Sequence, residues 1–429
     1  MAPSLLLRYC GGMKSPVTDY LNELLERNRN HDGGERASYI PELARANPHR
    51  FGIAMTTVEG RTYSVGDDNI EFTLQSMSKP FAYAAALDMH GKEYMSERVG
   101  VEPSGEAFNE LSIEEDSNRP DNPMINVGAI AVHGLLLEKD TPSQERIEYL
   151  REFFSRLAGR ELTIDQDVFT SELETAERNF AMGHMLKGLS VFDGPAHGVV
   201  EGYIAQCAVK VNIRDLSVMG ATLSNGGIQP HTREQVIEPL VARQVLSVMV
   251  SAGMYDASGT WFADVGIPAK SGVSGGILGV LPGQLGLGVF SPSLDAKGNS
   301  VRGIRVFKEL SDRMGLHIMD TEAYSYHAVR AVRQVGDELI IELQGRLEFS
   351  NAEEILSQLE ELEYNCTDVV IDLTRVSEAN RVGRHMLLDG LHRLQEEGLQ
   401  VSLLDPDNIL KFKNSAQDDG IHYLRSQQK

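Results

Sequence analysis

The sequence predicts a two-part protein whose first part has the pattern of an α+β domain. Two strand-like runs, at 51–58 and 61–65, are joined by the tight turn Glu59-Gly60 and are followed by an apolar helix. A hairpin that leads into a buried helix predicts an antiparallel sheet with helices packed on it. From about 88 to 215, loops alternate with helical runs, which predicts a helical subdomain.

The pattern returns to strands before the first part ends. Runs at 277–280 and 285–290 have the character of strands and are joined through Leu281-Pro282-Gly283-Gln284. The first domain is therefore expected to open and close with strands around a helical middle.

Beyond residue 320 the pattern changes to that of a small α/β domain. Strands are expected at 338–343, 368–373 and 399–404, with helices at 352–364 and 382–397 between them. A chain of 429 residues is too long for one ordinary domain. We expect one domain over 1–320 and a second over 321–429.

Composition and charge predict a soluble globular protein that does not bind nucleic acid. Hydrophobic residues make up 41% of the chain and charged residues 24%. The formal net charge is -22 at pH 7, with a pI near 5.0. Affinity for a phosphate backbone comes from Lys and Arg, so this acidic balance argues against a nucleic-acid partner.

The N-terminus and the cysteines bear on the compartment. The apolar run 5–7 is broken by Arg8 and is shorter than a signal-peptide core or a membrane span, so we expect a cytoplasmic protein that is not in a membrane. Cys10, Cys207 and Cys366 are widely spaced, which favours buried thiols over disulfides or a zinc site. The chain has no H-E-x-x-H motif and no phosphate-binding loop, and we expect neither a metal nor an organic cofactor.

Three helices have recognisable sequence signals. The segment 17–29 has an amphipathic pattern. Thr141, followed by Pro142 and Gln144, predicts an N-cap with a capping box. The apolar face of that helix is expected to consist of Ile147, Leu150, Phe153, Phe154 and Leu157. Ser350 with Glu353 predicts a cap for the helix at 352–364.

A serine and a lysine lie three residues apart where the first apolar helix is expected to begin, in Leu74-Gln75-Ser76-Met77-Ser78-Lys79-Pro80-Phe81. On a helix, positions i and i+3 share a face, so Ser76 is a candidate nucleophile and Lys79 a candidate base. The base must be neutral, which requires burial or a neighbouring cation to lower its pKa from about 10.4. The alternative is a helix-start serine beside a solvated lysine.

A second motif, Lys270-Ser271-Gly272, strengthens this interpretation. A Ser-x-x-Lys helix start followed much later by Lys-[Ser/Thr]-Gly on a strand is the acyl-enzyme arrangement of the penicillin-recognising enzymes. Gly272 lets a substrate approach the strand backbone, and the N–H that follows it is a candidate oxyanion donor.

Between and around these two motifs, the chain resembles the serine-dependent glutaminases, which share a serine β-lactamase-like fold. The resemblance runs from about residue 20 to 316. The matching segments are Tyr39-Ile-Pro-Glu-Leu43, Gln75-Ser-Met-Ser-Lys79, Val101-Glu-Pro-Ser-Gly105, Asn122-Pro-Met-Ile-Asn-Val-Gly-Ala-Ile130, Ser171-Glu172, Arg178-Asn179, Tyr203, Gln206-Cys207, Ala221-Thr-Leu-Ser-Asn-Gly-Gly227, Gly253-Met-Tyr-Asp256 and Lys270-Ser-Gly-Val273.

The resemblance implies a role for each matching position. Ser76 is the nucleophile, Lys79 is the general base, and Tyr255 lies within hydrogen-bond reach of both. Tyr39 closes over the site, and the backbone at Ser76 and Val273 forms the oxyanion hole. The substrate-holding positions are Asn126, Glu172, Asn179 and Tyr203.

The chemistry of L-glutamine agrees with these roles. The substrate offers an ammonium, a carboxylate and a side-chain amide, so its site needs one anion, neutral donors and a nucleophile. Taken singly, the residues have structural alternatives: Glu172 as a solvated helix residue, the asparagines as turn residues and the tyrosines as core aromatics. The number of ordered matches favours the functional interpretation.

The second domain resembles STAS domains through Asp372-Leu-Thr-Arg-Val376 and the helix that contains Gly383. The phosphoacceptor motif of that family, Asp-Ser-Ser/Thr-Gly, is here Asn380-Arg381-Val382-Gly383, so the acceptor serine is absent. We therefore expect the domain to bind a protein partner or a nucleotide without acting as a serine switch.

The resemblance as a whole implies a glutaminase that hydrolyses L-glutamine to L-glutamate and ammonia through an acyl-serine. We expect a homo-oligomer, either a dimer or a tetramer. The alternative is a β-lactamase-like or penicillin-binding-like acyl-serine sensor fused to a STAS signalling module.

Overall fold

The computed structural model describes residues 15–31, 33–38, 40–103, 112–114, 116–320, 327–361, 366–410 and 421–424. The chain divides into two compact units, which are described separately. The larger unit is built from Leu21–Asp312, and the smaller unit contains the described residues beyond 326.

The larger unit contains a five-stranded antiparallel sheet in the order β2-β1-β7-β6-β5. Its strands are β1 (Gly52–Thr57), β2 (Thr62–Gly66), β5 (Ala269–Ser271), β6 (Gly276–Leu281) and β7 (Leu285–Phe290). The two predicted hairpins are therefore confirmed. They join through the pairing of β1 with β7, in which Ile53 lies opposite Val289.

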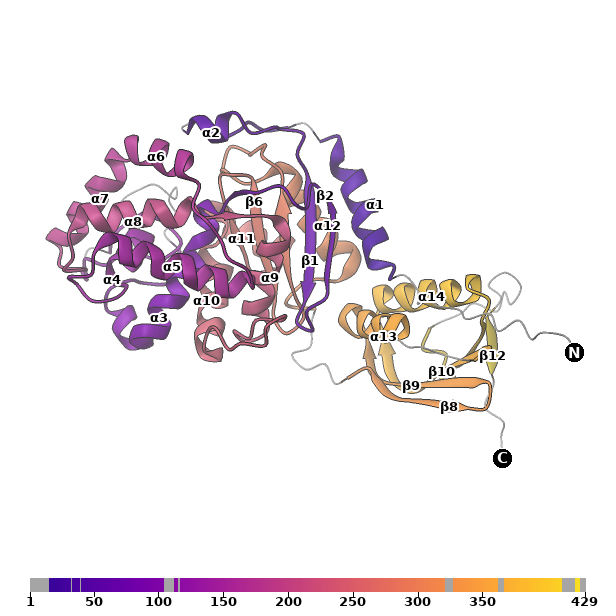
Figure 1. Ribbon diagram of the computed structural model, residues 1–429. Helices are drawn as coiled ribbons and strands as arrows, with labels where there is room; N and C mark the ends of the chain where they lie inside the picture. The colour runs from indigo at the N-terminus through magenta and orange to yellow at the C-terminus, as the bar shows by residue number, and fades with distance from the viewer. Residues whose placement is uncertain are drawn as a thin grey trace, which may run out of the picture. The chain divides into compact units, whose positions relative to one another are not determined.

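One face of this sheet is covered by helix α9 (Ile213–Ser224), which packs against β1, β6 and β7 (Figure 1). Asn212 and Asp215 form a capping box at the start of the helix. The helix lies unusually close to β7 because this strand has glycines at 286 and 288. A Cβ atom at Gly286 would be 2.1 Å from the backbone nitrogen of Ala221 and 2.2 Å from the backbone oxygen of Ser217.

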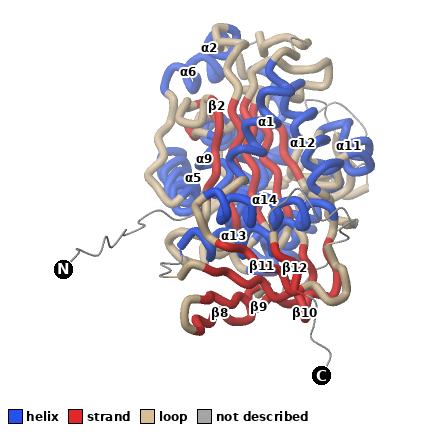
Figure 2. Tube along the Cα trace, turned by 90° about the vertical axis from the view of Figure 1, so that its right-hand side faces the viewer, coloured by secondary structure: helices blue, strands red, loops and turns tan. Residues whose placement is uncertain are grey.

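The opposite face is covered by helix α12 (Val301–Met314) and by part of α1 (Val17–Arg29), seen in front of the strands in Figure 2. Phe307 of α12 packs on Gly279 of β6, and Leu25 of α1 packs on Gly66 of β2. The predicted amphipathic helix at 17–29 is confirmed with the expected bounds.

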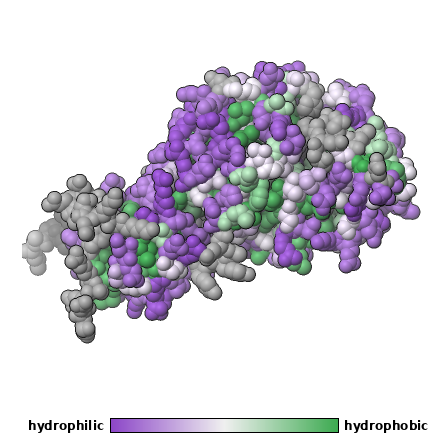
Figure 3. All heavy atoms as spheres, turned by 180° about the vertical axis from the view of Figure 1, so that it is seen from behind, coloured by the Kyte–Doolittle hydropathy of each residue, from purple (hydrophilic) through white to green (hydrophobic). Residues whose placement is uncertain are grey.

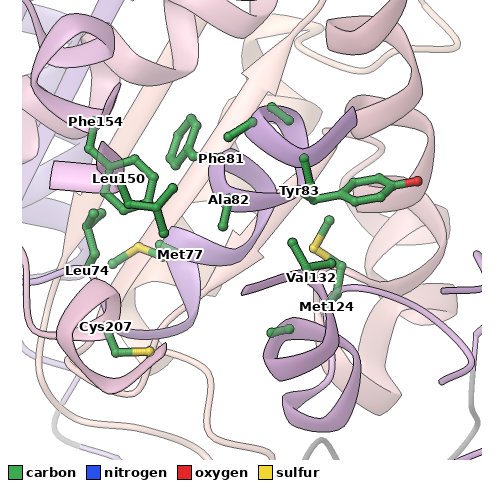
Figure 4. Packing of buried hydrophobic residues seen from close by; sticks show 14 of the residues in the cluster. Leu74, Met77, Phe81, Ala82, Tyr83, Met124, Val132, Leu150, Phe154 and Cys207 are labelled. Carbon is green, nitrogen blue, oxygen red and sulfur yellow. The ribbon is translucent and has the colours of Figure 1, made fainter. Parts of the chain in front are cut away.

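The rest of the larger unit is mainly helical, and most of its helices share one apolar core, whereas Leu43 of α2 belongs to a separate small cluster with Val273 and Leu294. Phe81 of α3 meets Phe154 of α5 edge to face in the shared core (Figure 4). The remaining elements are α2 (Pro41–Ala44), β3 (Phe72–Thr73), a 3₁₀ turn η1 (Gln75–Ser78), α3 (Lys79–Ser96), α4 (Asn126–Leu135), α5 (Ser143–Ala158), α6 (Gln166–Glu174), α7 (Glu177–Gly188), α8 (Ala196–Cys207), β4 (Lys210–Val211), α10 (Pro239–Ala252), η2 (Tyr255–Ala257) and α11 (Ser258–Asp264).

The predicted cap of α5 is wrong, although its apolar face is confirmed. The helix begins at Ser143 with Pro142 in the N-cap position, and no side chain caps it. Ser143 instead donates its hydroxyl to the carbonyl of Gly198 in α8, so a tertiary contact replaces the local one. All five predicted apolar residues are buried.

The smaller unit is a five-stranded sheet in the order β12-β11-β10-β9-β8 with two helices. Its elements are β8 (Val329–Val335), β9 (Glu338–Leu347), α13 (Phe349–Glu361), β10 (Asp368–Ala379), α14 (Arg381–Glu396), β11 (Gln400–Leu404) and β12 (His422–Leu424). Strands β9 to β12 are parallel, and β8 is antiparallel to β9. The three predicted strands and two helices are confirmed, whereas both edge strands, β8 and β12, were missed.

The helix starts in the smaller unit differ from the prediction. Helix α13 begins at Phe349, so Ser350 lies inside the helix and is not its N-cap. The cap that the structure shows is Asn380, whose side chain accepts a hydrogen bond from the backbone N–H of Gly383 at 2.8 Å.

On the face seen in Figure 3, polar side chains predominate among the described residues, with smaller apolar patches between them. Within the described part of the chain, no helix has both the length and the apolar character needed to cross a membrane.

The close contact between α9 and β7 predicts that Gly286→Ala destabilises the larger unit. The added methyl would meet backbone atoms of α9 that cannot rotate away, and overpacking of this kind costs about 1 to 3 kcal/mol. Urea unfolding followed through the fluorescence of Trp261, the single tryptophan of the chain, measures the loss.

Gly188→Ala is the control, because a Cβ at Gly188, the last residue of α7, would meet nothing within 4 Å. It should leave the unfolding midpoint unchanged or raise it. Equal midpoints for the two variants would contradict the packing argument.

Candidate active site

Ser76 lies in η1, the 3₁₀ turn between β3 and α3, and is 7% exposed. The sequence predicted an α-helix start here, but the α-helix begins at Lys79, whose backbone N–H bonds the carbonyl of Ser76. The prediction that the two side chains lie together does not depend on this difference, because residues i and i+3 eclipse one another in a 3₁₀ turn. Pro80 is the second residue of α3, where its missing N–H is tolerated.

The amine of Lys79 is buried, with 1% of the residue exposed. Burial lowers the pKa of Lys79 to about 8, against the opposing effects of Cys207 and Glu172. Its Nζ donates to Oδ1 of Asn126 at 2.7 Å and to the carbonyl of Met124 at 3.3 Å. The alternative of a solvated lysine is therefore wrong.

Tyr255 lies next to Ser76, with which it shares a side-chain hydrogen bond. It lies in η2 with φ +56 and donates its hydroxyl to the carbonyl of Ser271 at 3.0 Å. Burial raises the pKa of this phenol. Nζ of Lys270 is 4.0 Å from the centre of the tyrosine ring, and burial together with the charge of Lys79 lowers the pKa of Lys270.

Asn126 and Tyr203 join the same cluster from two other helices. Asn126 is the first residue of α4, and its Oδ1 accepts from the hydroxyl of Tyr203 in α8 at 3.2 Å as well as from Lys79. The two donors hold the amide oxygen toward Lys79. The sequence alone could not bring these helices together.

Glu172, in α6, is 8% exposed, so it is not the solvated helix residue of the alternative. Its Oε2 accepts from Nε2 of Gln75, the residue before Ser76, at 3.2 Å. Burial raises the pKa of Glu172 to about 7, although Gln75 and Lys79 favour its ionised form. The site thus holds a buried carboxyl and a buried amine that both titrate near neutral pH.

For the remaining predicted residues that are described, the structure gives burial and neighbouring elements but no side-chain hydrogen bond with Ser76 or Lys79. Val273, between β5 and β6, is buried, and the adjoining Gly272 lies so close to η1 that a Cβ there would be 2.9 Å from the carbonyl of Leu74. Asn179 is half-buried in α7, which packs against α4 and α8. Tyr39 lies outside the described residues.

Sequence reasoning missed several groups around the site. Lys270 was part of a recognised motif but received no role, and its motif was the available signal. Cys207, buried beside the turn of Ser76 (Figure 4), has a thiol pKa that burial raises to about 12. His133 and Gln206 form a buried pair behind the site; Gln206 lies in a segment that matches the family but received no role, and no local pattern marks His133. Among the described residues, no group of three or more His, Cys, Asp or Glu side chains could hold a metal ion.

A hydroxyl and an amine of lowered pKa, buried together at the edge of an antiparallel sheet, are the arrangement of hydrolases that work through an acyl-serine. Comparisons with known proteins identify the family. The Glutaminase family model matches residues 34–319 and the STAS domain model matches residues 329–415. The chain belongs to the glutaminase family, whose reaction is the hydrolysis of L-glutamine, and it carries a STAS domain.

Individual relatives agree with this assignment. A glutaminase of Corynebacterium glutamicum is 51% identical over 395 residues, which cover 92% of this chain and 95% of the relative. A glutaminase of Trichormus variabilis is 47% identical over 306 residues, which cover 71% of this chain and 91% of the relative. The crystal structure of Mglu in its glutamate form has 45% identity and a TM-score of 0.71, and covers 92% of this chain and 100% of its own.

The predicted family, the fold class and the glutaminase activity are thereby confirmed. The alternative of a penicillin-binding-like sensor is not favoured, since these relatives are glutaminases.

Proposed function

We propose that this glutaminase hydrolyses the side-chain amide of L-glutamine with Ser76 as nucleophile and Lys79 as general base. The observation that carries this proposal is the buried Lys79, whose pKa is lowered to about 8, one helical turn from the hydroxyl. At neutral pH a substantial fraction of this amine is unprotonated and able to take a proton, whereas a solvated lysine is almost fully protonated.

In the first half-reaction, Oγ of Ser76 attacks the side-chain carbonyl of glutamine while its proton passes to Nζ of Lys79. The oxyanion that forms is stabilised by the backbone N–H groups of Ser76 and Val273. The C–N bond then breaks, ammonia leaves with a proton that returns from Lys79, and a glutamyl ester remains on Ser76. Tyr255, hydrogen-bonded to Ser76, orients the hydroxyl.

In the second half-reaction, water attacks the ester. Lys79 accepts the proton of the water, and Oγ of Ser76 takes a proton back as L-glutamate leaves. Glutamate is the compound named for the Mglu crystal form, which supports glutamate as the product of this reaction.

The other site residues are proposed to hold the amino-acid end of the substrate. Glu172 is the buried anion that pairs with the α-ammonium. Asn126, Asn179 and Tyr203 orient the α-carboxylate with neutral donors, and Tyr39 covers the site. The oxygen of Asn126 is engaged by Lys79 and Tyr203, so its amide hydrogens are the atoms proposed to face the carboxylate.

The STAS domain is proposed to act as an interaction module for a protein partner or a nucleotide. Phosphate would meet the free N–H groups at the start of a helix, but at this place Asn380 itself accepts from the N–H of Gly383 and Arg381 replaces the acceptor serine. These two features support a domain that is not switched by phosphorylation there.

We infer, in addition, a cytoplasmic homo-oligomer, either a dimer or a tetramer. The free thiols of Cys207 and Cys366 suit a reducing compartment. Exposed apolar side chains of two packed helices, Met89 and Tyr94 of α3 and Leu240 of α10, offer surface for self-association.

Ser76→Ala should abolish turnover, because only the nucleophile is removed. Loss of a covalent nucleophile lowers kcat by several orders of magnitude. Ammonia release from L-glutamine measures the loss, and thermal unfolding checks that the variant is folded. Activity above a few per cent of wild type would show that another group attacks the substrate.

Glu172→Gln should raise KM for glutamine, because the α-ammonium loses its anion in a buried site. Such a change costs about 2 to 5 kcal/mol, which corresponds to a rise in KM of about thirtyfold or more. Saturation kinetics with L-glutamine measure it. An unchanged KM would mean that the ammonium is held elsewhere.

The wild-type kcat/KM should rise with pH through two steps. Glu172 gains its charge as pH rises through about 7, and Lys79 loses its proton as pH rises through about 8; both changes produce the active form. Glu172→Gln should retain only the step near 8. A wild-type profile that falls between these values, or a variant with both steps, would contradict the assignment.

A truncated chain that ends at Asp320 should keep its activity. The proposed catalytic residues all lie before this point, and the relative from Trichormus variabilis is a glutaminase that matches only 71% of this chain. Its kcat should lie within about threefold of the full chain, as expected for a domain with its own core. Complete loss of activity in a folded truncated protein would show that the second domain contributes to catalysis.

A further inference from the structure

Three buried hydrogen bonds connect the helical core to the peptide bond that precedes Ser76. Nδ1 of His133 in α4 lies 3.0 Å from Oε1 of Gln206 in α8. Nε2 of Gln206 donates to Oγ of Ser78 at 3.2 Å, and this hydroxyl donates to the carbonyl of Gln75 at 2.8 Å. All four residues are at most 2% exposed.

These hydrogen bonds run in one direction. The amide nitrogen of Gln206 only donates, so its oxygen faces His133 and Nδ1 of that ring must carry a proton. Ser78 accepts from Gln206, which leaves its own proton for the carbonyl of Gln75. The donors therefore point from His133 to Gln75 without a conflict.

The His133 end is fixed as a neutral donor. Burial lowers the pKa of His133 to about 4, and the charge of Arg146 lowers it further, while Gln206 opposes both. Within the described structure, Nε2 of His133 has no hydrogen-bond partner. Gly202 packs against this edge of the ring, since a Cβ there would be 2.1 Å from Nε2.

The other end acts on a strained residue. Gln75 has φ +50, a left-handed conformation that is strained for a residue with a side chain and that clusters at functional sites. Its carbonyl belongs to the same planar peptide as the N–H of Ser76, and the two groups point in opposite directions. Whatever holds the carbonyl of Gln75 therefore sets the direction of the Ser76 N–H.

We propose that His133, Gln206 and Ser78 are positioning residues, which hold the Gln75–Ser76 peptide so that its N–H points at the developing oxyanion. The inference rests on the proposed function, in which that N–H is an oxyanion donor. Hydrogen bonds in series also polarise one another, so this series of three hydrogen bonds strengthens the N–H of Ser76 as a donor as well as orienting it.

Ser78→Ala compared with Ser217→Ala provides the first test. Each hydroxyl belongs to a residue that is 0% exposed and donates to a carbonyl three residues earlier at 2.8 Å. Ser217 also bonds the hydroxyl of Thr56. Ser78 bonds the amide of Gln206, and its Oγ lies 4.0 Å from Sγ of Cys207. The two variants should lose similar stability. Only Ser78→Ala should lower kcat, by about tenfold to a hundredfold, with KM within about threefold, because removal of an oxyanion donor itself costs about a hundredfold or more.

Gln206→Glu supplies a readout that a purely structural role would not change. As a neutral acid, the introduced carboxyl keeps the direction of the three hydrogen bonds, because it donates to Ser78 and accepts from His133. As a carboxylate it accepts from both, and the proton of Ser78 turns away from Gln75. The ratio of the variant's kcat to that of wild type should therefore fall as pH rises through the pKa of the introduced carboxyl, which burial raises.

Other titratable groups near these hydrogen bonds are present both in the wild type and in Gln206→Glu. They are His133, Arg146, Cys207, Lys79 and Glu172. The ionised carboxyl would also raise the pKa of Lys79, but that effect disappears once pH exceeds the pKa of Lys79, so a ratio that stays low there reports the lost orientation of the peptide.

His133→Phe tests whether the effect passes through Ser78. The replacement keeps a ring but removes the Nδ1 donor. It should lower kcat in the wild-type background and change it by less than about twofold in the Ser78→Ala background, since residues that act through one path are not additive.

The outcomes separate this inference from the proposed function. Activity in Ser76→Ala would overturn the proposed function. An inactive Ser76→Ala together with equal kcat for Ser78→Ala and Ser217→Ala, or a Gln206→Glu ratio that stays flat while the introduced carboxyl ionises, would overturn the positioning role alone. A selective loss in Ser78→Ala with a falling ratio supports it.

Discussion

The active site depends on the burial of the Lys79 amine. An ammonium taken out of water loses hydration that the carbonyl of Met124 and the amide of Asn126 replace only in part. The same low-dielectric surroundings raise the pKa of Glu172. One physical cause, burial, therefore lowers the pKa of an amine and raises the pKa of a carboxyl, so that both lie near neutral pH.

This burial is a property of the assembled larger unit. Helices α4, α6 and α8 bring Asn126, Glu172 and Tyr203 to the turn of Ser76, and none of these residues is near that turn in sequence. Glycines provide the close contacts that the arrangement requires. Gly272, directly after β5, allows this part of the backbone to approach η1. Gly286 allows α9 to lie on the sheet.

Ser76 lies on a turn that its own residues do not favour. The left-handed Gln75 persists because its side chain bonds Glu172 and its carbonyl bonds Ser78. In the proposed mechanism, Gln75 thereby links the carboxyl of Glu172 to the peptide bond of Ser76.

The sequence by itself determined the strands and helices whose patterns are local, together with the Ser76, Lys79 and Lys270 motifs. It misplaced the starts of α5 and α13 and missed edge strands β8 and β12, because caps and short edges depend on neighbours distant in sequence. It also missed His133 and Gln206, whose pairing exists only once α4 packs on α8. Residue types and their spacing identify the chemistry, but burial and pKa values arise from tertiary packing, since water is excluded only when the helices close around the site.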